Sequence, residues 1–163
     1  MVWILKPVRS ISDLDFARKV ALDLLSVRPR SEAELRTALA KKNVPSDVVD
    51  DLCARFREVG LLDDAAFAAT LVTSRSEFSK RGKYRIRQEL REKGVSDDVA
   101  EEALAEVSGD DELTAARAVA AKRSRALEGL ERHVAQRRLA GTLARRGFSP
   151  DVVMQVVKET LIS

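Results

Sequence analysis

Cysteine, aromatic residues and long apolar stretches are all scarce in this chain of 163 residues. The single cysteine, Cys53, excludes an intramolecular disulfide and fits a reducing compartment. Aromatic residues make up only 4% of the chain, which argues against a β-sandwich or barrel. No apolar run approaches the roughly 18 residues that a membrane-spanning helix needs. The sequence therefore predicts a cytoplasmic protein without membrane contact.

Residues that build catalytic or metal sites are equally scarce. His133 is the only histidine, and Cys53 cannot complete a zinc site or a nucleophile–base pair with it alone. The Gly82–Lys83 pair lacks the upstream glycine and the downstream Ser or Thr of a phosphate-binding loop. Asp63 and Asp64 are interpreted as the start of a helix, where acidic side chains suit the helix dipole. We therefore predict that the protein is not an enzyme and that it uses no metal and no cofactor.

Helix-forming residues, by contrast, are abundant and repeat along the chain. The pattern apolar, three residues, Leu, three residues, Gly, apolar occurs over residues 86–95 and again over residues 139–148. A third copy covers residues 35–44, with Asn43 in place of the glycine. Apolar residues four apart lie on one helical face, and Gly or Asn suits the left-handed residue that ends a helix. Each copy therefore predicts a helix, a tight turn and a second helix.

Polar residues at the expected helix boundaries support this interpretation. Ser31, with Glu34 three residues later, has the pattern of a capping box. Ser46, Ser96 and Ser149 stand at or near the starts of the second helices, where a hydroxyl can accept a bond from a free backbone amide. Gly60 is expected to close the last helix of the first copy.

A further apolar helix precedes each helix pair, which gives three three-helix units. The predicted fold is all-α, with nine helices in three tandem three-helix repeats that form an elongated, curved array. We place a flexible leader over residues 1–12, repeat 1 over 13–61, repeat 2 over 62–109 and repeat 3 over 110–163. The apolar spacing is about seven residues longer in repeat 3, which predicts a longer internal loop within residues 124–133.

The three-helix unit used three times resembles the RecX family. The likeness is carried by Ala-Leu-Asp-Leu-Leu over residues 21–25, leading to Arg28, Arg30-Ser31 and Glu34-Leu35. It is also carried by Val-Gly-Leu-Leu-Asp-Asp over residues 59–64, which Phe67-Ala68, Arg75 and the Gly94 turn follow. The resemblance covers roughly residues 14–160, although repeat 3 diverges.

Membership in this family would imply a bacterial regulator that binds RecA nucleoprotein filaments along their groove. It would also imply inhibition of strand exchange, ATP hydrolysis and co-protease activity, and so modulation of homologous recombination, DNA repair and the SOS response. The expected partner is the RecA filament, weak contact with single- or double-stranded DNA is left open, and we expect a monomer.

Charge is unevenly distributed, although the net charge is only +3. Residues 75–93 and residues 122–146 each contain eight basic side chains, whereas residues 95–112 contain eight acidic ones and no base. Within the first block, Lys83, Arg87 and Arg91 predict a basic stripe along one helix. The residues expected to contact the filament or DNA are Arg75, Lys80, Arg81, Lys83, Arg85, Arg87, Arg91, Arg137, Arg138, Arg145 and Arg146.

One other interpretation of these basic blocks stays open. They could be solvated helix surface, with arginines near helix ends complementing the dipole. Tyr84 is counted as the only ring near them, so stacking on single-stranded bases is not supported as a main mechanism.

A helix-turn-helix DNA-binding protein is the alternative function, since residues 86–104 and 139–157 each predict a helix, a turn and a helix. The second helix of the former carries Asp97, Asp98 and Glu101, whereas a base-reading helix needs Arg, Asn or Gln. An enzyme is the third hypothesis, for which the sequence offers no set of catalytic residues, and a helical-repeat scaffold without regulatory activity is left open beside it.

Overall fold

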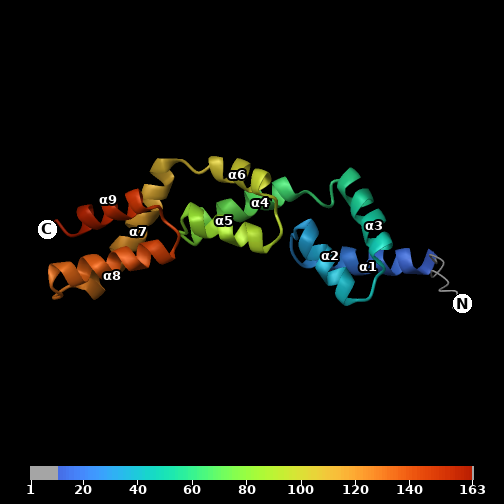
Figure 1. Cartoon of the computed structure of the whole chain (residues 1–163), viewed down its shortest axis with the longest axis horizontal. Coiled ribbons are helices and arrows are strands. Elements are labelled where there is room, and N and C mark those ends of the chain that lie inside the picture. Colours follow the sequence, from blue (N-terminus) through green and yellow to red (C-terminus); the bar gives the residue numbers. More distant parts are fainter. Residues whose placement is uncertain (1–10, 163) are drawn as a thin grey trace, which may run out of the picture. The chain divides into compact units, whose positions relative to one another are not determined.

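The structure, a computed structural model, describes residues 11–162 (Figure 1). Within that range nine α-helices and one π-helical turn follow one another without a strand, which confirms the predicted all-α class. Residues 1–10, most of the predicted leader over 1–12, lie outside the described residues. The chain divides into two compact units, the first ending at Phe67 and the second beginning at Ala68.

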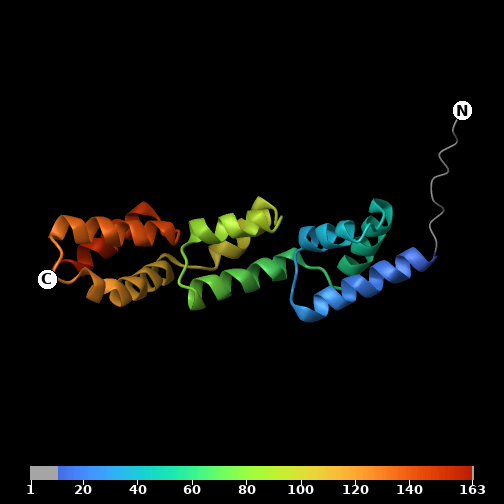
Figure 2. The same cartoon turned by 90° about the horizontal axis from the view of Figure 1, so that it is seen from below.

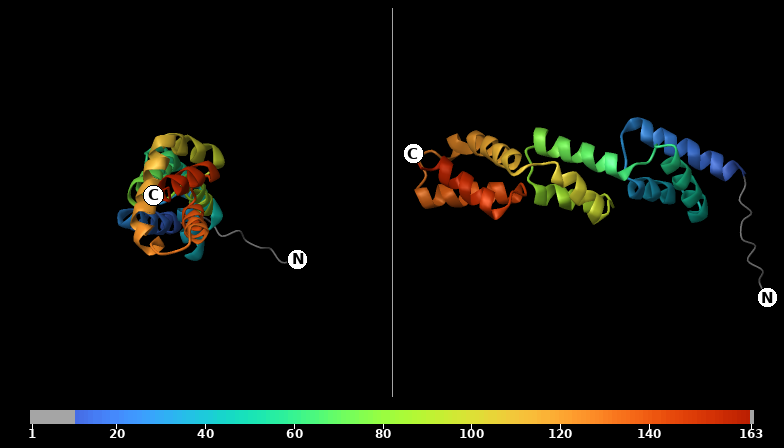
Figure 3. Two further views of the ribbon diagram at one scale, coloured as in Figure 1. Left: turned by 90° about the vertical axis from the view of Figure 1, so that its left-hand side faces the viewer. Right: turned by 90° about the horizontal axis from the view of Figure 1, so that it is seen from above.

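The first unit contains the three helices of repeat 1. They are α1 (Ile11–Val27), α2 (Glu32–Lys41) and α3 (Ser46–Glu58), and α1 packs against both others (Figure 3, right). Their shared core is fully buried and includes Leu35, Leu39, Leu52 and Cys53. Burial raises the pKa of the Cys53 thiol, so this residue is a protonated core side chain.

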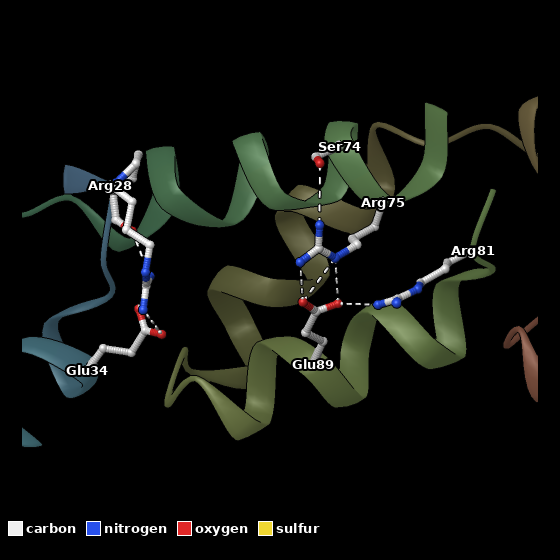
Figure 4. Close-up of polar contacts among 7 residues, drawn as sticks. Arg28, Glu34, Ser74, Arg75, Arg81 and Glu89 are labelled. Carbon is white, nitrogen blue, oxygen red and sulfur yellow. Dashed lines mark hydrogen bonds and ion pairs between the residues drawn. The ribbon is translucent and has the colours of Figure 1, made fainter. Parts of the chain in front are cut away.

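The start of α2 shows how the sequence sets a helix boundary. The Ser31 hydroxyl accepts from the Glu34 amide at 3.1 Å, and the Glu34 carboxylate accepts from the Ser31 amide at 3.1 Å. This is the predicted capping box. A third amide of the first turn, that of Glu32, donates to Asp64 Oδ1 at 2.9 Å. Arg28 adds two bonds of 3.2 Å to Glu34 (Figure 4).

The second unit contains most of repeat 2 and all of repeat 3. Helix α4 (Asp64–Thr73) leads into the π-helical turn η1 (Ser74–Phe78), followed by α5 (Lys83–Glu92) and α6 (Asp97–Ala105). Repeat 3 consists of α7 (Gly109–Leu127), α8 (Arg132–Arg145) and α9 (Pro150–Thr160), which lie side by side (Figure 2). Their common core is apolar and includes Ala116, Val119, Leu139, Leu143 and Val156.

The turns between the paired helices follow the predicted pattern. Asn43, Gly94 and Gly147 have φ of 59°, 75° and 92°, so each is the left-handed residue after a helix. The Ser96 and Ser149 hydroxyls each accept an amide hydrogen bond of 3.4 Å at the start of the next helix. Ser46 does not do so, because Pro45 takes the cap position of α3 and no side chain caps that helix. The repeat detected in the sequence is therefore a repeat of backbone geometry.

The longer internal loop predicted for repeat 3 is wrong. α7 ends at Leu127 and α8 begins at Arg132, so the connection has the same length as those before α2 and α5. The extra residues lengthen helices instead: α8 has 14 residues where α2 and α5 have 10 each. Residues 110–128 contain neither glycine nor proline, so nothing stops α7 before Gly129.

Repeats 2 and 3 are joined by backbone contacts between two turns. The Gly82 amide donates to the Arg146 carbonyl at 2.9 Å, and the Tyr84 amide donates to the Gly147 carbonyl at 3.1 Å. A Cβ on Gly82 would lie 2.3 Å from the Gly147 carbonyl carbon and oxygen, so only glycine fits. These contacts hold the segment before α5 against the α8–α9 turn.

Candidate functional site

The basic residues of the second unit fall into two groups that differ in their partners. In the first group, Glu89 of α5 binds two arginines (Figure 4). Arg75 Nη2 lies 2.7 Å from Glu89 Oε1, and Arg81 Nη1 lies 3.0 Å from Glu89 Oε2. Hydrogen bonding to Arg75 lowers the pKa of Glu89 against the opposing effect of burial. Glu89 is therefore ionised at neutral pH and neutralises much of the charge of both arginines.

The predicted basic stripe on α5 is also largely paired. Arg87 binds both oxygens of Glu101, and Arg91 Nε lies 2.9 Å from Asp97 Oδ1. Hydrogen bonding to these arginines lowers the pKa of Glu101 and of Asp97. The acidic stretch of α6 therefore neutralises the stripe, and among its members only Lys83 has no ion pair within the described residues.

The second group surrounds a hollow of about 390 Å³ between α7 and α8. Its apolar lining includes Leu127 and Leu139, which belong to the core of repeat 3. No acidic residue lines it. Four arginines do: Arg123 of α7 and Arg137, Arg138 and Arg145 of α8.

A second hollow, of about 370 Å³, lies beside the first and shares Arg123 with it. It is bordered by η1, by α7 and by the end of α8, and again by no acidic residue. Arg146 is held there because its Nη1 donates to the Ser79 carbonyl at 2.9 Å. Lys80 reaches this hollow from a left-handed backbone position with φ of 49°.

Together these side chains form one surface, hereafter the basic surface. None of them takes part in an ion pair within residues 11–162. Cations without an ion pair around hollows that no carboxylate lines attract anions, although Lys80 also borders a neighbouring hollow lined by Glu77, Glu106 and Asp111. The members are Lys80, Lys122, Arg123, Arg137, Arg138, Arg145 and Arg146.

The structure thus separates the basic residues expected to be contacts. Five of them lie on the basic surface: Lys80, Arg137, Arg138, Arg145 and Arg146. Arg75, Arg81, Arg87 and Arg91 are ion-paired, and Arg85 donates to Gln88 at 3.0 Å. Lys122 and Arg123 also lie on the basic surface but were not among the predicted contacts. Their position in the second basic block, on the same helix as the apolar Val119, could have indicated them.

Phe78 corrects the view that Tyr84 is the only ring near the basic residues. Phe78 is 80% exposed and lines the second hollow of the basic surface. Tyr84 lies instead beside the paired Arg87, whose guanidinium carbon is 5.5 Å from the ring centroid. An aromatic ring therefore does accompany unpaired cations.

Other kinds of site receive no support within the described part of the chain. His, Cys, Asp and Glu side chains form no group of three or more there that could hold a metal ion. None of the helices in residues 11–162 combines the length and the apolar character needed to cross a bilayer.

Tandem three-helix domains with an unpaired basic surface define a helical-repeat protein suited to binding anionic partners. The RecX family's models of its first, second and third three-helix domains match residues 17–56, 63–104 and 110–157. The chain belongs to the RecX family, as its sequence motifs predict.

Individual relatives agree over most of the chain. Regulatory protein RecX of Streptomyces coelicolor is 37% identical over 145 residues, which are 89% of this chain and 77% of the relative. Regulatory protein RecX of Mycolicibacterium smegmatis is 40% identical over 149 residues, covering 89% and 79%. The crystal structure of RecX from Lactobacillus salivarius superimposes with a TM-score of 0.86 at 22% identity, over 93% of this chain and 98% of that one, and shows the shared fold.

Proposed function

We propose that this RecX-family chain binds RecA nucleoprotein filaments and thereby inhibits the recombinase, ATPase and co-protease activities of RecA. Family membership supports a regulatory role, since the relatives are named regulatory proteins. The observation that carries the proposal here is the basic surface, where seven cations lie together without an ion pair among the described residues. The proposed result in the cell is modulation of DNA repair and the SOS response.

The proposed mechanism is competition by occupancy. A nucleoprotein filament exposes acidic protein surface and DNA phosphates, and either one can neutralise unpaired arginines. Binding through such contacts needs no cofactor and changes no covalent bond. We propose that the five predicted residues on the basic surface are the main contacts, and that Lys83 and Arg85 lie at their margin. The ion-paired arginines are proposed to hold repeat 2 in shape.

The setting of this function is also part of the proposal. We propose that the protein acts as a monomer in the cytoplasm, where RecA filaments form, and that it is not an enzyme. The three domains, which we bound by sequence at 13–61, 62–109 and 110–163, would then be binding modules of one chain.

The helix-turn-helix alternative has less support from the side chains. Its first candidate reading helix, α6, presents Asp97 and Glu101, which bind Arg91 and Arg87. The second, α9, offers Gln155, but its amide donates to Glu159 at 3.0 Å. Neither helix presents an Arg or Asn side chain, and Gln155 is the only Gln on either one, so sequence-selective duplex binding is not proposed.

The test is single-stranded-DNA-dependent ATP hydrolysis by preassembled RecA filaments, with the protein titrated in below one copy per RecA. We expect strong inhibition by the wild type. The variant Arg137→Gln, Arg138→Gln, Arg145→Gln should need at least about tenfold more protein for half-inhibition, because three proposed contacts are lost.

The matched control removes three charges elsewhere, at exposed positions that line neither hollow: Lys41→Gln, Lys42→Gln and Lys158→Gln. It should inhibit like the wild type. An absence of inhibition by the wild type would reject the proposed function. Equal losses in both variants would instead reject the basic surface as its site, leaving only net charge.

A further inference from the structure

Phe78 is an exposed aromatic side chain for which folding gives no reason. Its ring is 80% exposed, whereas Phe56, Phe67 and Phe148 are each less than 10% exposed. Burying a phenylalanine side chain stabilises a fold through the hydrophobic effect, so an exposed one forgoes that contribution. Phe78 therefore contributes little to the core of the second unit.

The local backbone holds Phe78 out of the core. It is the last residue of the π-helical turn η1, in which the Ser79 amide donates to the Ser74 carbonyl at 3.2 Å. The wider turn displaces the helix end relative to an α-helix, and such turns occur frequently at functional sites. The next residues are fixed by the Arg81 amide, which donates to the Arg75 carbonyl at 2.9 Å. The position of the ring is thus set by ordered backbone on both sides.

The ring borders two hollows of different character. On one side it meets Ala69, Thr70, Thr73 and Ser74, which carry no charge. On the other side it lines the second hollow of the basic surface, whose apolar lining is Ala118 and Val119. A flat ligand can therefore reach the aromatic ring beside a cationic hollow.

Four cations share that second hollow with the ring, and no carboxylate does. They are Lys80, Lys122, Arg123 and Arg146. Arg146 uses Nη1 to bind the Ser79 carbonyl, which orients its guanidinium and leaves further N–H groups for a ligand. The hollow is therefore partly organised before any ligand binds.

An aromatic ring beside several phosphate-binding cations fits a single nucleic-acid strand. A base can stack on the ring while neighbouring phosphates bind the cations, and such stacking tolerates any sequence. A duplex can use only the cations, because its bases are already stacked on one another. An acidic protein surface likewise engages the cations but gives the ring no flat partner.

We propose that the hollow between η1 and α7 is a subsite for single-stranded nucleic acid, in which a base stacks on Phe78 and the flanking phosphates bind Lys80, Lys122, Arg123 and Arg146. This inference deepens the proposed function by naming a ligand for part of the basic surface. It concerns the isolated protein, so its test requires no RecA.

The test is fluorescence anisotropy of a labelled oligothymidine of about 15 nucleotides, a length within the range that single-strand-binding modules cover. A labelled duplex of equal length is measured in parallel at the same salt concentration. Phe78→Ala should weaken binding to the single strand about tenfold, the effect of losing one stacked base, and leave duplex binding within about twofold. Phe78→Leu should behave like Phe78→Ala, and Phe78→Trp like the wild type.

Tyr84→Ala is the matched control, because Tyr84 is the other exposed ring of this region and lines neither hollow of the basic surface. It should bind both ligands like the wild type. Unchanged single-strand affinity in Phe78→Ala, or equal losses on single strand and duplex, would overturn the subsite. An absence of single-strand binding by the wild type would also overturn it. None of these results would affect inhibition of RecA by the wild type, which tests the proposed function separately.

Discussion

The backbone amide of Lys83 donates a hydrogen bond of 3.1 Å to Glu112, a carboxylate that is only 8% exposed. Lys83 begins the second helix of repeat 2, and Glu112 lies on the first helix of repeat 3. The same relationship occurs one repeat earlier, where the Glu32 amide donates to Asp64 at 2.9 Å. In both places an amide left free at a helix start is satisfied by a carboxylate of the next repeat. Repeats 2 and 3, which lie in one compact unit, are therefore joined by a shared helix cap, and the bond between Glu32 and Asp64 has the same form within the first unit.

Replacing Glu112 with alanine should destabilise the second unit. The change leaves the Lys83 amide without its partner and removes a buried acceptor, at a cost of about 1–3 kcal/mol in the free energy of unfolding. Glu112→Gln keeps an acceptor oxygen and should lose less. Urea unfolding followed by circular dichroism measures both variants. Equal stability of Glu112→Ala and the wild type would show that the cap contributes nothing.

A methyl group at Gly82 should disrupt the junction between repeats 2 and 3. The Cβ of Gly82→Ala would lie 2.3 Å from Gly147 backbone atoms, which cannot move aside as a side chain could. Such overpacking costs about 1–3 kcal/mol or more. The control is Gly109→Ala, since a Cβ at Gly109 meets nothing within 4 Å. Thermal unfolding should show a lower midpoint for Gly82→Ala alone, and a similar decrease in both variants would contradict the prediction.

The ion pair between α7 and α9 should make stability depend on acid. Hydrogen bonds from Arg117 and Gln155 lower the pKa of Glu159 to about 2. A carboxyl with a lowered folded-state pKa contributes stability above its unfolded pKa, and this is lost as the pH falls from about 4.5 towards 2. In Glu159→Gln the decrease in urea midpoint over that range should be smaller than in the wild type. Identical pH profiles would show that this pair does not affect stability.

Much of the fold could be predicted from the sequence because its signals are local. Asn43, Gly94 and Gly147 each mark a helix end, since a left-handed residue is required there. Ser31 and Glu34 mark a helix start through two mutual hydrogen bonds. The length of the connection before α8 could not be predicted by aligning apolar residues, because extra residues lengthen a helix as readily as a loop.

The site could be predicted only in part, because pairing of charges depends on tertiary contacts. Arg87 and Arg138 look alike in the sequence, yet only Arg87 meets a carboxylate, that of Glu101 fourteen residues away. Phenylalanine is an apolar residue that is usually buried, so the sequence gives no sign that Phe78 is exposed. Its exposure follows from the π-helical turn, which no local sequence pattern predicts. The sequence therefore predicted where basic residues gather but not which of them are free.

Removing the carboxylate that holds Arg75 and Arg81 should affect stability rather than regulation. Glu89→Gln leaves two arginines without their shared anion, which should cost about 1–3 kcal/mol in the free energy of unfolding at neutral pH. Because the folded-state pKa of Glu89 is lowered, the wild type should lose this contribution as the pH falls below about 4.5, and the variant should lack that loss. Half-inhibition of RecA ATP hydrolysis should need the same protein concentration, within about twofold, as long as the variant is folded. A selective loss of inhibition by a fully folded Glu89→Gln would mean that the arginine cluster around Glu89, and not only the basic surface, contacts the filament.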